Sequence, residues 1–204
     1  MSVSGIITQN VTIGEHDYFR VAIDGNNFDL PYKKIGENNI AFLDISGKFK
    51  LIELCADALV RQFIDKGIEF DTIANPVSKS NALAHAIAVR WAGRSDPGFC
   101  STVVARKSAA STGLENAKSV EYTSVTTPAV QTLSLTAGDS EFIKGKKVLL
   151  IDDVFASGGT YNALETLVLS SGAKIAARAV IAIEEGAIID DELIYLFVLP
   201  VTTD

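Results

Sequence analysis

The chain has 204 residues, and its 18 Lys and Arg against 25 Asp and Glu give a formal net charge of −7. This length suits a single domain, since domains usually contain about 100–200 residues. With 48% hydrophobic and 21% charged residues, the composition is globular and excludes whole-chain disorder, collagen and coiled coil. The acidic balance argues against a nucleic-acid partner, because such partners are bound through clustered Lys and Arg.

The sequence shows no clear signal for membrane targeting, for a disulfide or for a metal site. The first residues do not combine a charged segment with a long apolar core, and no apolar run reaches the roughly 18 residues of a membrane span. We therefore expect a soluble cytoplasmic protein without a membrane partner. Cys55 and Cys100 have no CxxC or Cys/His spacing, which predicts neither zinc nor a disulfide, and both are expected to be buried. His16 and His85 lack metal-like partners nearby, so structural roles are favoured.

The period of the apolar residues changes several times along the chain. Up to about residue 45 the pattern is strand-like, with a hairpin turn at 25–27 between strands at 18–24 and 28–30. Helical spacing follows over 49–64 and ends before Gly67. The later elements expected are a strand at 70–74, a turn at 75–80, a helix at 81–91, a strand at 102–105, a strand at 147–151, a helix at 161–171, and strands at 176–183 and 194–198.

The segment between residues 106 and 145 is polar and rich in Ser, Thr and Ala. Two alternating pieces, 119–125 and 131–135, are expected to pair as a ribbon. Connections of this length in a compact domain are usually functional lids or disordered segments.

Strands that alternate with helices, and that are nearly continuous apolar runs, indicate a parallel sheet covered on both faces. The sequence therefore predicts an α/β fold in one domain, 1–204. Ligands bind such sheets at the carboxyl ends of the strands. We expect the chemistry to lie just after Ile73, Ala105, Ile151 and Ile183.

Acids and glycines follow the most apolar predicted strand. Asp152 and Asp153 come directly after Ile151, and Ser-Gly-Gly-Thr at 157–160 opens the next helix. Two carboxylates at the end of a buried strand are costly unless they meet hydroxyls, metal or cations. Glycines let the backbone approach a ligand, and the N–H groups of a helix start form a phosphate site. The pattern is neither a Walker A loop nor GxGxxG. The simpler alternative is a capped helix with a tight glycine turn.

This order of apolar residues, two acids, a short apolar stretch and Ser-Gly-Gly-Thr resembles the phosphoribosyl pyrophosphate (PRPP) signature of type I phosphoribosyltransferases, in their adenine/xanthine branch. The resemblance covers roughly 70–186. It implies a Rossmann-like parallel sheet, with a small N-terminal hood at 1–45 and a mobile loop at 108–130. It implies that Asp152 and Asp153 are catalytic and hold the ribose hydroxyls. Residues implied for the 5′-phosphate are Ala156, Ser157, Gly158, Gly159 and Thr160.

The resemblance extends to basic residues at two other strand ends. Ser78 and Lys79 lie in a turn that looks like the family's pyrophosphate loop, although Val77 stands where an acid is usual. Arg106 and Lys107 follow a strand end similar to that of adenine and xanthine phosphoribosyltransferases, where the basic pair faces pyrophosphate. The alternative for each is a solvated surface cation, because exposed lysines are the norm.

Residues near the acceptor base are less well defined. Glu121 resembles the Glu of a Glu-Tyr pair in adenine-type enzymes and is a candidate catalytic residue, or a charge on an exposed ribbon. Phe155, beside Val154, is the expected platform for a planar base, although a core aromatic would need no such role. Glu184 and Glu185 lie near the expected base pocket or form a solvated turn.

These features predict a purine phosphoribosyltransferase of purine salvage, with adenine favoured, that makes a nucleoside monophosphate and pyrophosphate from PRPP. The resemblance implies that Mg²⁺ arrives with PRPP, with no direct protein ligand, and that the protein is a homodimer. One alternative is a PRPP-sensing regulator without catalysis, although the first 45 residues are not basic and lack a helix-turn-helix pattern. Another is an orotate-type enzyme, for which Lys118 is available but the surrounding Gly-rich pattern is absent.

Overall fold

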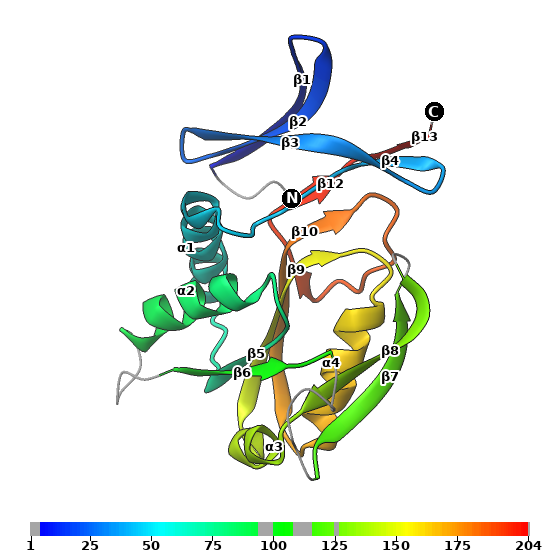
Figure 1. The fold of residues 1–204 in the computed structure, drawn as a ribbon. Coiled ribbons are helices and arrows are strands. Elements are labelled where there is room, and N and C mark those ends of the chain that lie inside the picture. The colour runs from blue at the N-terminus through cyan, green and yellow to red at the C-terminus, as the bar shows by residue number, and fades with distance from the viewer. Residues whose placement is uncertain (1–4, 94–99, 108–115, 125–126, 204) are drawn as a thin grey trace.

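The computed structural model describes residues 5–93, 100–107, 116–124 and 127–203. A central parallel sheet carries helices on both faces, and a smaller antiparallel sheet covers one end of it (Figure 1). The predicted α/β class is confirmed. The elements in chain order are β1 (Ile6–Ile13), β2 (His16–Ile23), β3 (Asn26–Ile35), β4 (Asn38–Ala41), α1 (Phe49–Asp65), β5 (Thr72–Pro76), α2 (Asn81–Ala92), β6 (Ser101–Ala105), β7 (Lys118–Ser124), β8 (Thr127–Leu135), α3 (Ala137–Ile143), β9 (Lys147–Phe155), α4 (Gly159–Ser170), β10 (Lys174–Glu184), β11 (Leu193–Ile194), β12 (Phe197–Leu199) and β13 (Val201–Thr203).

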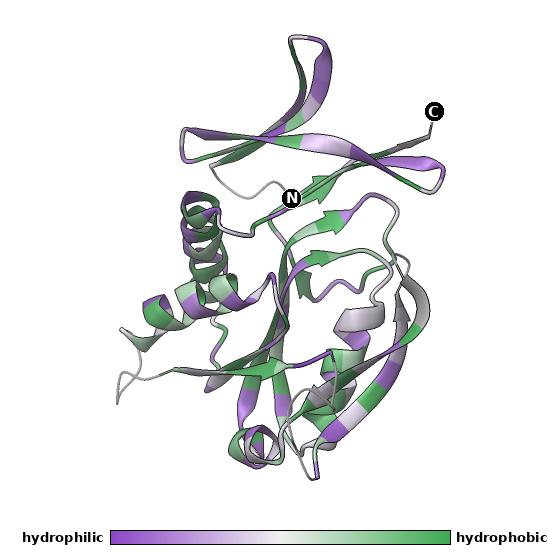
Figure 2. Cartoon of the chain, in the orientation of Figure 1, coloured by the Kyte–Doolittle hydropathy of each residue, from purple (hydrophilic) through white to green (hydrophobic). Residues whose placement is uncertain are grey.

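The central sheet has the strand order β11-β10-β9-β5-β6, and β12 also pairs with β10. Every one of these pairings is parallel. β5 is buried throughout, and β9 is buried from Val148 to Asp152. The apolar part of β9 is coloured as hydrophobic near the middle of Figure 2. Because helical connections cover both faces of a parallel sheet, its central strands have no polar face, as their sequence predicts.

Two hydrophobic cores lie on opposite faces of this sheet. The first packs α1 and α2 against the sheet and includes Leu51, Cys55 and Leu59, the apolar positions that predict α1. The second packs α4 and the β7–β8 ribbon against the other face and includes Leu150 and Leu164. The carboxyl ends of β5, β9 and β10 therefore emerge between two packed layers.

The hood is an antiparallel sheet with the order β1-β2-β3-β4-β13. The predicted hairpin between β2 and β3 is confirmed, but its turn lies at Asp24 and Gly25, with φ of 46° and 78°. Asn26 already pairs with Ile23, so the turn comes before the predicted 25–27. β13 adds the end of the chain to this sheet by pairing with β4, which sequence patterns did not predict.

The polar segment before β9 contains the predicted ribbon, with β7 antiparallel to β8. Tyr122, Leu133 and Leu135 are buried on its inner face, which packs against α4. The predicted mobile loop at 108–130 falls partly on residues 108–115 and 125–126, which lie outside the described part of the chain. The short helix α3 was not predicted; the Thr136 hydroxyl caps it by accepting the Asp139 N–H at 2.8 Å.

Both cysteines are free thiols. Cys55 is buried as expected, and burial raises its pKa to about 12. The expectation of burial is wrong for Cys100, which is only partly covered because it leads into the edge strand β6.

Within the ranges that the structure describes, no helix has the length and apolar character needed to cross a membrane.

Candidate active site

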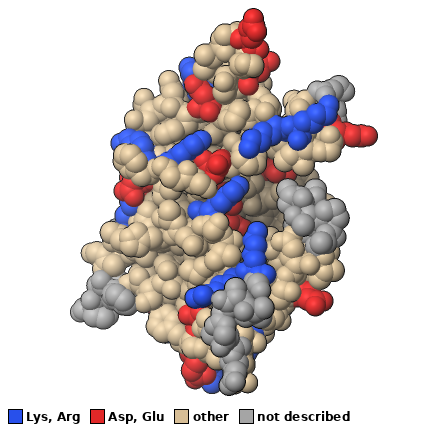
Figure 3. Space-filling view, viewed as in Figure 1, with Lys and Arg blue, Asp and Glu red and all other residues tan. Residues whose placement is uncertain are grey.

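A pocket of about 320 Å³ lies beneath the hood at the carboxyl ends of β5, β9 and β10. Figure 3 shows Lys and Arg side chains gathered around the hollow below the hood. The sequence-predicted residues that line this pocket are Ser78, Lys79, Lys107, Asp152, Asp153, Val154, Phe155, Ala156, Ser157, Gly158, Gly159 and Thr160. Segments far apart in the sequence are thus brought to one edge of the sheet, as the rule for parallel sheets requires.

The two aspartates belong to β9 itself. β9 runs on to Phe155 because β10 continues to pair with it as far as Ile183, so the prediction that the strand ends at 151 is wrong. Asp152 is buried, and its Oδ1 accepts a hydrogen bond from the Asp153 N–H at 2.8 Å. Burial, together with the charge of Asp153, raises the pKa of Asp152 well above its usual range. Asp152 therefore holds a proton more readily than an ordinary aspartate.

Asp153 has a different environment from Asp152. Its Oδ2 lies 3.8 Å from Lys79 Nζ, and its side chain is 14% exposed against 42% for the lysine. The adjacent carboxyl groups therefore differ: one is buried beside a like charge, and the other faces a cation across the pocket.

The turn between β9 and α4 folds closely over an aromatic ring. Gly158, the N-cap of α4, has φ of +79°, a left-handed conformation that other residues rarely adopt. A Cβ at this position would lie 2.8 Å from Phe155 Cζ. Glycine therefore allows both the turn and the close approach. The first N–H groups of α4 have no partner within the helix, and with the helix dipole they favour an anion.

The loop after β5 is held from inside by Asn75. This side chain is completely buried, and its Nδ2 donates to Asn81 Oδ1 at 2.8 Å and to Pro76 O at 3.1 Å. The Ser80 hydroxyl also donates to Pro76 O, at 2.7 Å. Both ends of the loop are therefore tied together, and Lys79 between them is presented to the pocket.

The hood contributes an aromatic ring beside Lys79. Lys79 Nζ lies 5.0 Å from the centroid of the Phe42 ring, and Lys33 Nζ lies 3.6 Å from the same centroid. The face of an aromatic ring attracts cations. Phe42 therefore helps to hold positive charge at the mouth of the pocket.

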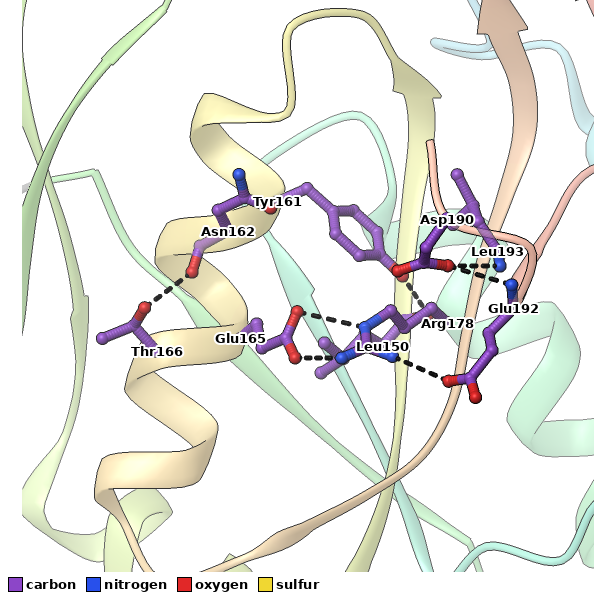
Figure 4. Close-up of polar contacts among 9 residues, drawn as sticks. All are labelled: Leu150, Tyr161, Asn162, Glu165, Thr166, Arg178, Asp190, Glu192 and Leu193. Carbon is purple, nitrogen blue, oxygen red and sulfur yellow. Dashed lines mark hydrogen bonds and ion pairs between the residues drawn. The ribbon is translucent and has the colours of Figure 1, made fainter. Parts of the chain in front are cut away.

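An ion-pair network supports α4 from the side of β10 (Figure 4). Arg178 donates from Nε to Glu165 Oε2 at 3.1 Å, and its Nη2 also contacts Glu165 Oε1. A further contact, from Nη1 to Glu192 Oε2 at 3.4 Å, reaches the segment before β11. The Tyr161 hydroxyl donates to Leu150 O at 3.3 Å. These contacts fix the first turns of α4, and with them the glycine turn, relative to the sheet.

Phe155 has a packing role. Its ring meets the Tyr161 ring edge-on, with the centroids 5.6 Å apart, and it belongs to the core around α4. It also lines the pocket. Base stacking on Phe155 stays a prediction beside this structural role.

Arg106 and Glu121 do not line the pocket. The backbone of Arg106 exchanges two 2.8 Å hydrogen bonds with Ser134 of β8, and its side chain is exposed. Arg106 thus pairs with β8, and Lys107 lies in the bend that follows it; Lys107 lines the pocket and Arg106 does not. Glu121 is exposed because its neighbour Tyr122 fills the inner face of the ribbon. The roles inferred for Arg106 and Glu121 stay predictions.

Sequence reasoning missed most of the residues that close the pocket from above. Ile35, Ile40 and Phe42 come from the hood, and Leu199 comes from β12. Their apolar side chains carry no motif, and the N-terminal pattern indicated only strands. Of the two glutamates that the sequence placed near the base pocket or in a solvated turn, Glu184 lines the pocket and Glu185 does not.

Comparison with known proteins agrees with this geometry. The family model described as "Phosphoribosyl transferase domain" matches residues 50–197, which is more than half of the chain. No curated protein matches the sequence. The chain therefore belongs to the phosphoribosyltransferase domain family, and it is an enzyme of the transferase class.

Solved structures place the fold within this family. An adenine phosphoribosyltransferase from Thermoanaerobacter pseudethanolicus is similar with a TM-score of 0.64 and 21% identity, over 83% of this chain and 95% of that one. The APRTase from Giardia lamblia, complexed with 9-deazaadenine, gives 0.58 and 17% over 97% and 98%. The Trypanosoma brucei adenine enzyme, in complex with AMP, pyrophosphate and ribose-5-phosphate, gives 0.57 and 21% over 76% and 66%. The fold is that of the type I phosphoribosyltransferases, with an additional antiparallel hood.

Proposed function

We propose that this protein transfers the 5-phosphoribosyl group of PRPP to a purine base, with adenine favoured, and releases pyrophosphate and a nucleoside monophosphate. The observation that carries the proposal is one pocket in which a glycine turn at a helix start, an acidic pair and a basic loop meet. A sugar that carries a phosphate at one end and a diphosphate at the other needs these three features together.

The phosphate and the ribose are assigned to the end of β9 and the start of α4. Backbone N–H groups of 156–160 and the hydroxyls of Ser157 and Thr160 bind the 5′-phosphate, since free helix N–H groups favour phosphate. Asp152 and Asp153 accept hydrogen bonds from the ribose hydroxyls. Positive charge develops on the ribose ring as the bond to the leaving group breaks, and the two carboxyl groups complement it.

The diphosphate is assigned to the basic side of the pocket. Ser78 and Lys79 approach it from the loop after β5, and Lys107 approaches from the end of β6. Mg²⁺ is usually held by one or two carboxylates together with substrate phosphates, and the acidic pair beside this basic side fits such an arrangement. The oxygens of PRPP would hold the ion near Asp152 and Asp153, where it supplies charge neutralisation for the leaving pyrophosphate.

The base is assigned to the space between the sheet and the hood. Val154 and Phe155 form its floor, and Ile35, Ile40 and Leu199 lie among the residues above it. A nitrogen of the base attacks the anomeric carbon while the bond to pyrophosphate breaks. An apolar enclosure of this kind excludes the water that would otherwise hydrolyse the activated sugar. The proposal includes a homodimer, and it keeps the roles inferred for Arg106 in PRPP binding and for Glu121 in catalysis as predictions.

Adenine is favoured because the similar structures described above are named adenine enzymes. The test is pyrophosphate release from PRPP and Mg²⁺ with adenine, hypoxanthine, guanine, xanthine and orotate in parallel. Adenine is expected to react fastest, and the double variant Asp152→Asn with Asp153→Asn is expected to lose turnover. A reaction with orotate alone would replace the base assignment, and no reaction with any base would leave PRPP sensing as the better account.

A further inference from the structure

One carboxyl group in the pocket has no role in the proposed transfer. Glu184 is the last residue of β10, is partly buried and lines the pocket. Among the described residues, its side chain makes no hydrogen bond or ion pair. Its neighbour Glu185 is exposed, lies outside the pocket lining, and accepts the Val201 N–H on Oε2 at 3.2 Å. Of these two adjacent glutamates, only Glu184 is available to a ligand.

The register of the sheet gives the direction of Glu184. Ile183 is paired with Phe155, and both pack in the core around α4. Ala182 is paired with Val154, and both pack in the core around α1 and α2. Successive side chains of a strand point to opposite faces. Glu184, which follows Ile183, therefore points to the same side as Val154, where the hood covers the pocket.

The surroundings of Glu184 at this end of the pocket are apolar. Val154 lies on the same side of the sheet as Glu184. Leu199 of β12 is the residue paired with Glu184 in the neighbouring strand. Burial raises the pKa of Glu184. Lys79, a cation of the pocket, is paired with Asp153 and not with Glu184. A partly buried carboxylate without a partner is unfavourable unless a ligand supplies a hydrogen-bond donor.

We propose that Glu184 selects the acceptor base by accepting a hydrogen bond from an amino group on the ring, so that the pocket takes neutral 6-aminopurines. This inference rests on the proposed function. With the attacking nitrogen at the ribose, beside Asp152 and Asp153, the far edge of the base points toward the hood. An ionised carboxylate only accepts hydrogen bonds. At position 6, a 6-oxo purine directs a carbonyl oxygen at the carboxylate where adenine offers an N–H donor, and orotate adds a second negative charge.

The test replaces the acceptor with an isosteric amide and compares adenine with hypoxanthine. Glu184→Gln is expected to lower kcat/KM for adenine. The ratio of kcat/KM for adenine to that for hypoxanthine should fall by about 10- to 100-fold, because an amide can also donate a hydrogen bond to an oxo group. Glu185→Gln is the matched control and should leave the preference unchanged. Glu184→Asp, which keeps the charge on a shorter side chain, should retain the direction of the preference. An unchanged preference in Glu184→Gln overturns the inference.

A binding measurement separates this inference from the proposed catalysis. The dissociation constants of AMP and IMP are measured by calorimetry for the wild type and the same variants. If the wild type turns over no base but prefers AMP, and Glu184→Gln removes that preference, the proposed catalysis fails and the inference stands. If turnover occurs and Glu184→Gln retains both preferences, the inference is overturned and the proposed function stands. Binding of neither nucleotide by the wild type overturns both.

Discussion

Lys79 and Asp153 face each other across the pocket, with Nζ and Oδ2 3.8 Å apart. The lysine comes from the loop after β5 and the aspartate from the end of β9. Two segments that are far apart in the sequence therefore meet in this pocket. A single ligand with hydroxyls next to a diphosphate would contact both side chains. Such a ligand would replace a solvated ion pair, which is worth little by itself, with charge-assisted hydrogen bonds.

Lys79→Gln removes this cation while keeping the length of the side chain similar. We expect KM for PRPP to rise by about 10- to 100-fold, since hydrogen bonds to charged groups contribute roughly 1.5–3 kcal/mol. Lys50→Gln, at an exposed lysine of α1, is the control and should leave KM unchanged. Steady-state kinetics with varied PRPP provide the measurement. Equal KM values for the two variants would remove Lys79 from the diphosphate site.

Asp152→Asn is expected to stabilise the ligand-free protein at neutral pH. Folding raises the pKa of this buried carboxyl, so its contribution to stability is full below the unfolded pKa of about 3.9 and is lost as pH rises through the raised value. The amide carries no charge, and its oxygen can still accept the Asp153 N–H. A gain of about 1 kcal/mol would raise Tm by roughly 2–4 °C.

The measurement for Asp152→Asn is Tm against pH for both proteins. The difference in Tm between Asp152→Asn and the wild type should shrink as pH falls toward the pKa of Asp152 in the unfolded chain. Asp191→Asn, at an exposed position, should follow the wild type throughout. A variant that is less stable than the wild type at neutral pH would show that the charged form of Asp152 stabilises the fold, against this account.

Gly158→Ala is expected to destabilise the turn at the 5′-phosphate site by more than the cost of placing alanine at a positive φ. The new Cβ would meet Phe155 Cζ at 2.8 Å, in addition to the cost of φ +79°. Gly47→Ala has a similar φ of +71° with nothing within 4 Å of the Cβ, so it isolates the conformational cost of about 1 kcal/mol.

Thermal unfolding and KM for PRPP are compared for the two glycine variants. Gly158→Ala should lose more stability and bind PRPP about 10-fold or more weakly, because the N–H groups of the helix start shift. Gly47→Ala should lose stability alone. The same KM in both variants would contradict the assignment of the turn to the 5′-phosphate.

Asn75→Ala is expected to loosen the loop that presents Lys79. It removes the Nδ2 bonds to Asn81 and Pro76 and should cost about 1–3 kcal/mol. Thr72→Val, at the other end of β5, removes a buried bond from Oγ1 to Ser101 O at 2.6 Å. Both variants should lower the free energy of unfolding, but only Asn75→Ala should raise KM for PRPP. A raised KM in both would mean that the loss of strand stability, and not the loop, is responsible.

Sequence patterns predicted the part of the site whose residues are neighbours in the sequence. Asp152 and Asp153 after an apolar strand, followed by glycines at a helix start, define one structure because charge burial and tight turns leave few alternatives. The apolar runs of β5, β9 and β10 likewise predicted a parallel sheet, and hence the edge at which ligands bind. The comparisons confirm the family that this pattern resembles.

Sequence patterns did not predict the parts of the site that depend on tertiary packing. Ile40 lines the pocket because the hood folds over the sheet, and Leu199 lines it from β12, beside the end of β10. An apolar residue carries no local signal of what it will cover. The pairing of β13 with β4 brings residues 201–203 into the N-terminal hood, which no local period can indicate. Arg106 and Lys107 are adjacent cations, and it takes the structure, with Arg106 paired to Ser134 and Lys107 in the bend beyond it, to show that Lys107 is the one that lines the pocket.

The central claim is that the pocket binds PRPP, and calorimetric titration of the wild type with PRPP, with and without Mg²⁺, tests it most directly. The account predicts saturable binding at one site per chain that strengthens with Mg²⁺ and is lost in the double variant Asp152→Asn with Asp153→Asn. Absence of binding by the wild type, or equal binding by the double variant, would contradict the assignment of this pocket.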